Sequence, residues 1–320
     1  MEIYGPVPSW RLGNSLGVDL VEPPKGYSKI CSYDCLYCQL GHNTFRTIHP
    51  KTMDVSEQEF DVLREKIKQT KPDYITFSGQ GEPTLNLSLG RVADKIKQMT
   101  DIPLAVLTNG SLISNKEVRR SLNKCDLVIA KTDAGTQRLF RKINQPCRGI
   151  NLNNIVEGIK EIHVRVAIQT LLFSFKKLTN VDEESIKSLI EIYKKINEVK
   201  PIEIFLGTAY RPSGSEKIMA LTPERLEEIA GQINRETKIQ VVYYKKNEPV
   251  VVRGERHKTE EKEFLDLLKR RPCTKEDLIT RFGKGNLRKI IDDFVEKGQV
   301  STRIKQGVVY YFYNNEEEKA

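Results

Sequence analysis

Short apolar runs alternate along this chain with longer segments whose apolar residues recur at helical spacing. The runs are rich in β-branched and aromatic side chains, which is typical of buried strands. The runs predicted to be strands are Leu16–Leu20, Tyr74–Phe77, Leu104–Leu107, Leu127–Ile129, Val164–Phe173 and Ile202–Leu206.

Amphipathic helices are predicted between these strands. Ser56 and Glu59 form a capping-box pattern, and Thr222 followed by Pro223 is typical of an N-cap and a first helical position. The predicted helices span residues 56–69, 87–99, 115–122, 151–161 and 182–198, and another begins at Thr222. Strands that alternate with helices in this way predict an α/β fold built from right-handed βαβ units around a parallel sheet.

The pattern changes after about residue 254, where a polar, linker-like stretch is followed by three short helical stripes and two strands. Thr274 and Asp277 form a capping pattern at the start of the second stripe. Three helices followed by a hairpin resemble a small winged-helix domain. We therefore predict two domains, a barrel over residues 1–253 and a winged-helix-like domain with an acidic tail over residues 254–320.

Three cysteines lie within eight residues, at the spacing C-x3-C-x2-C: Cys31, Cys35 and Cys38. Thiolates this close together are able to hold one iron–sulfur cluster. A cubane has four irons, so three thiolates leave one iron without a protein ligand, and an open metal position is typical of reactive sites. Spacing alone leaves two alternatives open, a three-cysteine zinc site and free thiols in the core.

A second motif, Ser78-Gly-Gln-Gly-Glu82-Pro83, directly follows the strand Tyr74–Phe77. Together with the three cysteines and the aromatic residue Tyr37 before the last of them, it resembles the radical S-adenosylmethionine superfamily. The opening segment of residues 5–19 and the Cys38-Gln-Leu-Gly41 junction are similar to the group compared with the tRNA wyosine-base synthases. The resemblance covers roughly residues 4–215 and implies a partial (β/α)6 barrel of the TIM type.

The resemblance also implies a set of cofactor-binding residues. Cys31, Cys35 and Cys38 would ligate a [4Fe–4S] cluster whose open iron takes the methionine part of S-adenosylmethionine. The stretch Gly79, Gln80, Gly81, Glu82 and Pro83 would receive the methionine amine, through a carbonyl near Gln80 or Gly81 or through the Glu82 side chain.

Further candidates follow other strand ends, where barrels of this kind carry their chemistry. Tyr37 is suited to stack on adenine. Asn109, Asp133 and Gln169 are candidates for the ribose or the carboxylate, and Gly207 and Ala209 for the adenine edge. Thr108-Asn109-Gly110 by itself is also an ordinary turn signal. Candidate substrate anchors are Lys131, Arg148, Arg165 and Arg211.

The implied reaction is reductive. An electron from a reductant of the flavodoxin or ferredoxin type would pass through the cluster and cleave the sulfonium, giving methionine and a 5′-deoxyadenosyl radical. That radical would abstract hydrogen from a substrate, while the protein supplies positioning and exclusion.

Composition narrows the setting. The chain of 320 residues has a formal net charge of +9, which favours a polyanionic partner such as RNA, although a lysine-rich composition serving only solubility remains open. It has no apolar run long enough for a membrane span and no signal-peptide core, and three of its six cysteines are scattered singly, so we expect a cytoplasmic protein without a disulfide framework.

Three functions compete. The first is a radical enzyme that acts on RNA, in particular a tRNA base; against the wyosine reaction itself, no cysteine precedes Cys31 to hold a second cluster. The second is a radical enzyme that modifies a peptide, protein or small molecule and uses the winged helix as a separable docking module. The third is a DNA-binding regulator that senses redox state through its cluster.

Overall fold

The computed structural model describes residues 1–176, 178–245, 261–283 and 287–314. The predicted boundary between residues 253 and 254 and the predicted acidic tail lie outside these ranges. Within them, no helix combines the length and the apolar character that crossing a membrane would require.

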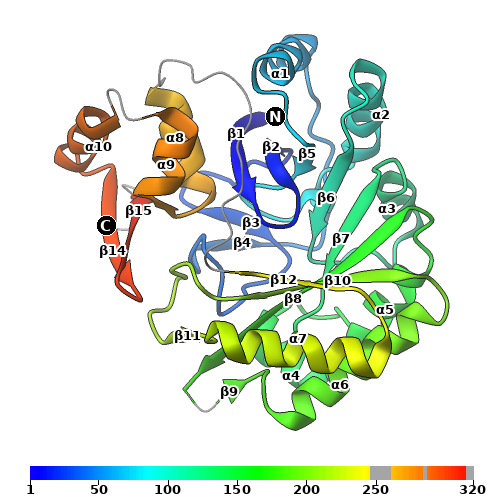
Figure 1. Cartoon of the computed structure of the whole chain (residues 1–320). Coiled ribbons are helices and arrows are strands. Elements are labelled where there is room, and N and C mark those ends of the chain that lie inside the picture. The colour runs from blue at the N-terminus through cyan, green and yellow to red at the C-terminus, as the bar shows by residue number, and fades with distance from the viewer. Residues whose placement is uncertain (177, 246–260, 284–286, 315–320) are drawn as a thin grey trace.

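One large curved sheet organises the fold (Figure 1). Its main path runs β1-β2-β5-β6-β7-β8-β10-β12; β1 is antiparallel to β2, and every later pair is parallel. The bounds are β1 Glu2–Ser9, β2 Gly13–Asp19, β5 Tyr74–Phe77, β6 Leu104–Thr108, β7 Leu127–Lys131, β8 Arg165–Phe175, β10 Ile202–Thr208 and β12 Val241–Tyr243. The short strands β9 Leu178–Thr179 and β11 Ile218–Ala220 pair with the end of β8.

Helices connect the parallel strands and cover the outer, convex face of the sheet (Figure 1). They are α1 Glu57–Thr70, the 3-10 turn η1 Pro83–Leu85, α2 Leu89–Met99, α3 Lys116–Leu122, α4 Gln137–Asn144, α5 Leu152–Lys160, α6 Glu183–Asn197 and α7 Pro223–Thr237. The predicted caps are present: Ser56 and Glu59 form a capping box, and Thr222 accepts a hydrogen bond from the Arg225 amide. The predicted α/β fold with a partial barrel is confirmed.

The sequence patterns missed several short elements, among them β1, β12 and α4. β1 was predicted as an extended lead-in, and the short edge strand β12 was not predicted. The helix α4 was not predicted either, because its apolar signal is weak: Phe140 and Ile143 are its buried apolar side chains. The omission of α4 matters most, since this helix ends beside the cysteine loop.

The concave face of the sheet carries a smaller apolar cluster of its own. Trp10, in the turn between β1 and β2, enters this space and meets Phe205 edge-on at 6.1 Å between ring centroids. Trp10 therefore packs inside the concave face of the sheet. Arg11 follows it and donates to the Oε1 of Gln169, near the middle of β8.

The C-terminal residues form a second unit against β1 (Figure 1). Its elements are α8 Glu261–Arg270, β13 Cys273–Thr274, α9 Lys275–Phe282, α10 Leu287–Glu296, β14 Val300–Lys305 and β15 Val308–Tyr313. The three helices and the hairpin are as expected, and β13 extends the hairpin to a three-stranded sheet in the order β13-β15-β14. The assignment of this unit to the winged-helix family stays a prediction.

The two units share buried contacts. Tyr4 of β1 belongs to the apolar core of the C-terminal unit, together with Phe264 and Phe294. Arg211, which follows β10, is 8% exposed and donates to the Pro272 carbonyl at 2.5 Å. The second unit is therefore packed onto the barrel.

Candidate cofactor site at the open end of the barrel

The loop that carries the cysteines is fixed to the end of β5 through backbone contacts. It contains the short parallel strands β3 Lys29–Cys31 and β4 Thr44–Arg46. The Ile30 amide donates to the Gln80 carbonyl at 2.9 Å, and the Glu82 amide donates back to the Ile30 carbonyl at 3.0 Å. A Cβ on Gly81 would lie 1.8 Å from the Ile30 oxygen, so only glycine permits this approach. The Gly-x-Gly-Glu motif thereby sets the position of Cys31.

The end of α4 supports the same loop from the other side. The Leu36 amide donates to the Ile143 carbonyl at 3.0 Å, and the Asp34 amide to the Asn144 carbonyl at 3.2 Å. Just beyond α4, the Cys147 amide donates to the Ser32 carbonyl at 2.9 Å. Because α4 escaped prediction, these supports were not visible in the sequence.

The three thiols are half-buried, and each has polar neighbours. The Asn109 amide nitrogen lies 3.4 Å from the Cys31 sulfur, and the Asn144 amide nitrogen 3.5 Å from the Cys35 sulfur. Burial alone would lower the pKa of Lys29, but the nearby Cys38 and Asp34 raise it above its usual value. Donors and a cation aimed at sulfur stabilise negative charge on it.

Burial raises the pKa of the Cys31 thiol, and it raises the pKa of Cys35 to about 11. The charge of a neighbouring cysteine adds to the rise in both cases, which shows that the thiols lie within electrostatic range of one another. An iron ion would reverse this preference, because a coordinating thiol is deprotonated outright.

Glu82 is buried and serves as the brace between two strand ends. Its Oε1 accepts bonds from the Thr84 and Thr108 hydroxyls at 2.7 Å each, and its Oε2 accepts the Asn109 amide at 2.6 Å. Burial raises the pKa of this carboxyl against the opposing effect of those hydrogen bonds. With both oxygens engaged by protein donors, Glu82 ties the motif after β5 to the end of β6.

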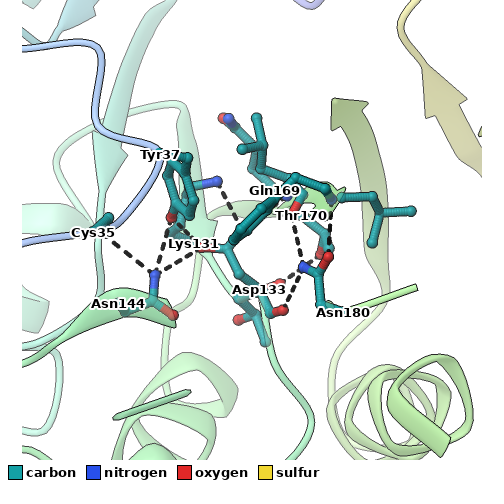
Figure 2. A network of polar contacts seen from close by, with 12 residues as sticks. Cys35, Tyr37, Lys131, Asp133, Asn144, Gln169, Thr170 and Asn180 are labelled. Atoms are coloured by element: carbon teal, nitrogen blue, oxygen red, sulfur yellow. Dashed lines mark hydrogen bonds and ion pairs between the residues drawn. The ribbon is translucent and has the colours of Figure 1, made fainter. Parts of the chain in front are cut away.

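A second buried carboxylate, that of Asp133 after β7, connects the cysteine loop to the barrel (Figure 2). Tyr37 donates its hydroxyl proton to Asp133 Oδ2, and Asn144 donates to the same oxygen at 2.8 Å. Lys131 reaches Oδ1 at 2.8 Å, and its ammonium also lies over the Tyr37 ring, 4.8 Å from the centroid. The Leu171 amide completes the set at 2.8 Å from Oδ1.

The remaining predicted residues gather on the concave side of the last strands. Gln169 pairs with Lys131 across β7 and β8, and Gly207 pairs with Leu171 across β8 and β10. Gly207 faces Trp10, whose ring lies 3.5 Å from the position of a Cβ there. Ala209 is buried in the apolar cluster that contains Tyr37. The strand ends therefore bring Tyr37, Asp133, Gln169, Gly207 and Ala209 to one side of the cysteine loop.

Two of the candidate substrate anchors are placed elsewhere. Arg165 starts β8, at the opposite end of the strand from the site, and pairs with Glu203 at 2.7 Å. Arg211 contacts the C-terminal unit instead: it donates to the Pro272 carbonyl and forms an ion pair with Asp277 at 3.4 Å. Both predictions as anchors were wrong, because a sequence pattern does not show which cations already have partners.

Several residues that shape the site were not singled out from the sequence. Asn144 is 1% exposed and donates to Asp133, to the Tyr37 hydroxyl at 3.0 Å and to Cys35, while its Oδ1 is buried with no partner. Asn180 bonds the Asp133 carbonyl at 2.9 Å (Figure 2). Lys29, 2% exposed, had a signal that was available: it is a lysine two positions before the first cysteine.

These residues fit an iron–sulfur cluster in their chemistry. One loop supplies three half-buried thiols, and amide nitrogens of Asn109 and Asn144 lie beside two of the sulfurs. Lys29 lies within electrostatic range of Cys31 and Cys38, and the buried Asn144 Oδ1 has no partner. Within the described ranges, no three cysteine, histidine, aspartate or glutamate side chains lie close enough together to hold a metal ion.

Comparison with known proteins settles the family. A family model described as the radical SAM superfamily matches residues 27–190. A UPF0026 protein of Methanocaldococcus jannaschii is 31% identical over 323 residues, which cover 97% of this chain and 95% of that protein. The chain belongs to the radical SAM superfamily, among its UPF0026 proteins.

Another relative of this radical SAM protein carries a different name. A protein of Brachyspira hyodysenteriae named GTPase Obg is 34% identical over 318 residues, which cover 98% of this chain but 45% of that protein. This chain therefore spans less than half of that relative, and the activity in its name is not carried over.

The fold agrees with the family. The structure of Streptococcus suis SuiB bound to S-adenosylmethionine aligns with a TM-score of 0.51 and 17% identity, over 73% of this chain and 52% of that one. The protein is an enzyme of a superfamily whose members use a [4Fe–4S] cluster, S-adenosylmethionine and a reductant. The finer grouping with the wyosine-base synthases stays a prediction.

A cleft of about 330 Å³ opens next to the cysteine loop, between the barrel and the C-terminal unit. The barrel contributes residues 39–43, directly after Cys38, together with Gln80 and Gly214. The C-terminal unit contributes two cations and two aromatic rings, and no carboxylate is among the lining residues: Lys269, Arg303, Phe312 and Tyr313.

Proposed function

We propose that this protein is a radical enzyme that holds its cluster on Cys31, Cys35 and Cys38 and binds S-adenosylmethionine at the adjoining strand ends. When bound, these cofactors supply a 5′-deoxyadenosyl radical that takes a hydrogen atom from the substrate. The observation that carries the proposal is the direct backbone bonding of the cysteine loop, through Ile30, to the Gly-x-Gly-Glu motif after β5.

The residues divide the work as follows. The Gly81 carbonyl is our candidate acceptor for the methionine amine. The Gln80 carbonyl already accepts the Ile30 amide, and both carboxylate oxygens of Glu82 are taken by protein donors. Pro83 starts η1 and ends the motif. Asn109 acts on the cluster side, since its amide nitrogen points at Cys31 and Ser32.

On the other side, Asp133 holds Tyr37 against the barrel and leaves the concave strand ends for the nucleoside. Gln169, Gly207 and Ala209 are our candidates on that side, where the Trp10 ring lies against Gly207. A reductant of the flavodoxin or ferredoxin type would approach the half-buried loop from solvent.

The test is chemical. Anaerobically reconstituted protein with dithionite should bind four irons per chain and convert S-adenosylmethionine to methionine and 5′-deoxyadenosine. Alanine at any one of Cys31, Cys35 or Cys38 should abolish the product, whereas Cys125→Ala, a buried cysteine on the helical side of the sheet, should not. An intact cluster that yields no 5′-deoxyadenosine would refute the proposal.

For the substrate, the cleft favours RNA over a peptide. The Lys269 ammonium lies 5.2 Å from the Tyr313 ring and the Arg303 guanidinium 4.9 Å from the Phe312 ring, so charge and flat apolar surface occur together. The phosphates of RNA would bind these cations, and its bases would stack on the aromatic rings. The formal net charge of +9 adds long-range attraction for a polyanion. Cytoplasmic placement is consistent with that substrate.

Filter retention of bulk tRNA tests the preference. The double variant Lys269→Gln/Arg303→Gln should reduce the slope of log affinity against log salt by about two, since each phosphate contact contributes about one. Lys262→Gln/Lys297→Gln removes two exposed cations of the same unit outside the cleft and serves as the control. Retention that ignores salt, or that the two double variants change equally, would favour the peptide or small-molecule alternative.

A further inference from the structure

One buried ion pair joins the two units directly behind the proposed S-adenosylmethionine loop. Asp19 ends β2 and is 3% exposed, and Arg270 ends α8 and is 7% exposed. The Arg270 Nε lies 3.0 Å from Asp19 Oδ2, although the two residues are 251 positions apart.

The same carboxylate supports the loop after β5. The Gln80 amide donates to Asp19 Oδ2 at 2.8 Å, and the Val21 amide donates to Oδ1 at 3.3 Å. A Cβ on Gly79 would lie 2.0 Å from the carboxylate carbon, so Gly79 and Gln80 pass directly over Asp19. The position of this carboxylate therefore sets the backbone of the motif.

Tyr4, which shares the apolar core of the C-terminal unit, makes a second contact with the loop after β5. The Tyr4 hydroxyl is 2.7 Å from the Ser78 hydroxyl, one residue before Gly79. The Arg270 guanidinium carbon lies 5.1 Å from the Tyr4 ring centroid, and its Nη1 donates to the Asp266 carbonyl at 2.9 Å. Arg270 is thus held by its own helix while it reaches the barrel.

We propose that Arg270 is a positioning residue for the S-adenosylmethionine loop, supplied by the C-terminal unit to a site on the barrel. A buried carboxylate without a counter-charge does not stay ionised in place. Without Arg270, Asp19 would lose the charge that makes it a strong acceptor for the Gln80 amide. The Gln80 carbonyl accepts the Ile30 amide, so a displaced Gln80 would also shift the start of the cysteine loop.

This inference deepens the proposed function and rests on it. It also reverses the expectation for a separable docking module. If the second unit holds the cofactor loop, its removal impairs cofactor binding in addition to substrate turnover.

The experiment compares Arg270→Gln with Arg281→Gln in the reconstituted holoprotein. Arg281 is a fair control because it is 8% exposed, lies in the same unit and pairs with Glu263 at 3.1 Å rather than with the barrel. Equilibrium dialysis with labelled S-adenosylmethionine should show at least tenfold weaker binding for Arg270→Gln and less than threefold for Arg281→Gln. Arg270→Lys, which keeps the charge, should recover part of the loss.

Two further readouts separate positioning from general loss of structure. The electron paramagnetic resonance spectrum of the reduced cluster should change on addition of S-adenosylmethionine in Arg281→Gln and should not change at the same concentration in Arg270→Gln. Asp19→Asn should weaken binding like Arg270→Gln, and the double variant should be no worse than either single one, because both act through one pair.

Equal binding losses in Arg270→Gln and Arg281→Gln would overturn the inference, as would unchanged binding in Arg270→Gln. If Arg270→Gln does not fold, Asp19→Asn takes its place in the comparison with Arg281→Gln, and the same two outcomes decide. A wild-type holoprotein that neither binds nor cleaves S-adenosylmethionine would refute the proposed function instead, so the two failures are distinguishable.

Discussion

Two buried aspartates support the site, and they obtain their partners in different ways. Asp133 is held by residues of the barrel alone: Lys131 two positions away, Asn144 and Tyr37. Asp19 depends on Arg270 from the second unit. Asp133 therefore secures the cysteine loop from within one unit, whereas the support that Asp19 gives to the S-adenosylmethionine loop depends on both units.

The largest effect should come from Asp133→Ala. It removes the acceptor shared by Tyr37 and Asn144 and leaves Lys131 without its partner, and breaking a buried ion pair costs about 3–5 kcal/mol. We expect a lower midpoint in urea unfolding together with reduced iron content after reconstitution. Full iron content in Asp133→Ala would show that the cysteine loop does not need this carboxylate.

Gly81→Ala should follow in size. The added Cβ would overlap the Ile30 carbonyl and force the two backbones apart, and strain of this kind costs about 1–3 kcal/mol. Iron content and S-adenosylmethionine affinity should fall together, because Gly81 lies between the two loops. Gly149→Ala is a useful control, since its Cβ position has no atom within 4 Å, although its φ of +93° adds strain of its own.

Asn144→Ala sharpens the comparison on the cysteine side. It removes the donor to Asp133, Tyr37 and Cys35 at once, and unsatisfied buried acceptors cost about 1–3 kcal/mol. Losing an N–H donor to sulfur should also lower the cluster's reduction potential in a redox titration. A potential equal to that of the wild type would mean that Cys35 gains nothing from this amide.

The smallest effect should come from Asp277→Asn, which changes how the stability of the protein depends on pH. Burial opposes ionisation of Asp277, but Arg271 and Arg211 hold the pKa of its carboxyl below the usual range. A depressed pKa in the folded state adds stability above the unfolded value of about 3.9, and this stability is lost as pH falls through the folded pKa. Asp277→Asn should therefore be less stable than the wild type at pH 6, with a smaller difference below pH 4, in urea unfolding of the apoprotein.

The sequence predicted most of the barrel because its signals are local. The apolar runs, the Ser56 capping box and the Thr222 N-cap each lie within a few residues, and the structure confirms them. The two motifs were equally local, since each of them, the three cysteines and the Gly-x-Gly-Glu stretch, lies within a few consecutive residues. The helix α4 was missed because its own local signal is weak: it has eight residues, and its buried apolar side chains are Phe140 and Ile143.

The pairing of side chains was not predictable, because it depends on contacts between distant segments. Nothing in the sequence near Asp19 indicates that Arg270 forms an ion pair with it. Nothing in the motif shows that both oxygens of Glu82 accept hydrogen bonds from the protein, namely from Thr84, Thr108 and Asn109. One prediction from the sequence was that the Glu82 side chain accepts the methionine amine. Because protein donors occupy both Glu82 oxygens, the backbone beside Glu82 is the better candidate acceptor.

The placement of Tyr4 in the core of the C-terminal unit has a consequence for biosynthesis. During translation β1 is synthesised well before Phe264 and Phe294, the residues of the C-terminal unit that share an apolar core with Tyr4. Contacts of such long sequence separation form late, since the intervening chain must first be ordered. We therefore expect the barrel to be assembled around an unfinished edge, and the cofactor pocket to close only after the C-terminal unit has been synthesised and has folded against β1.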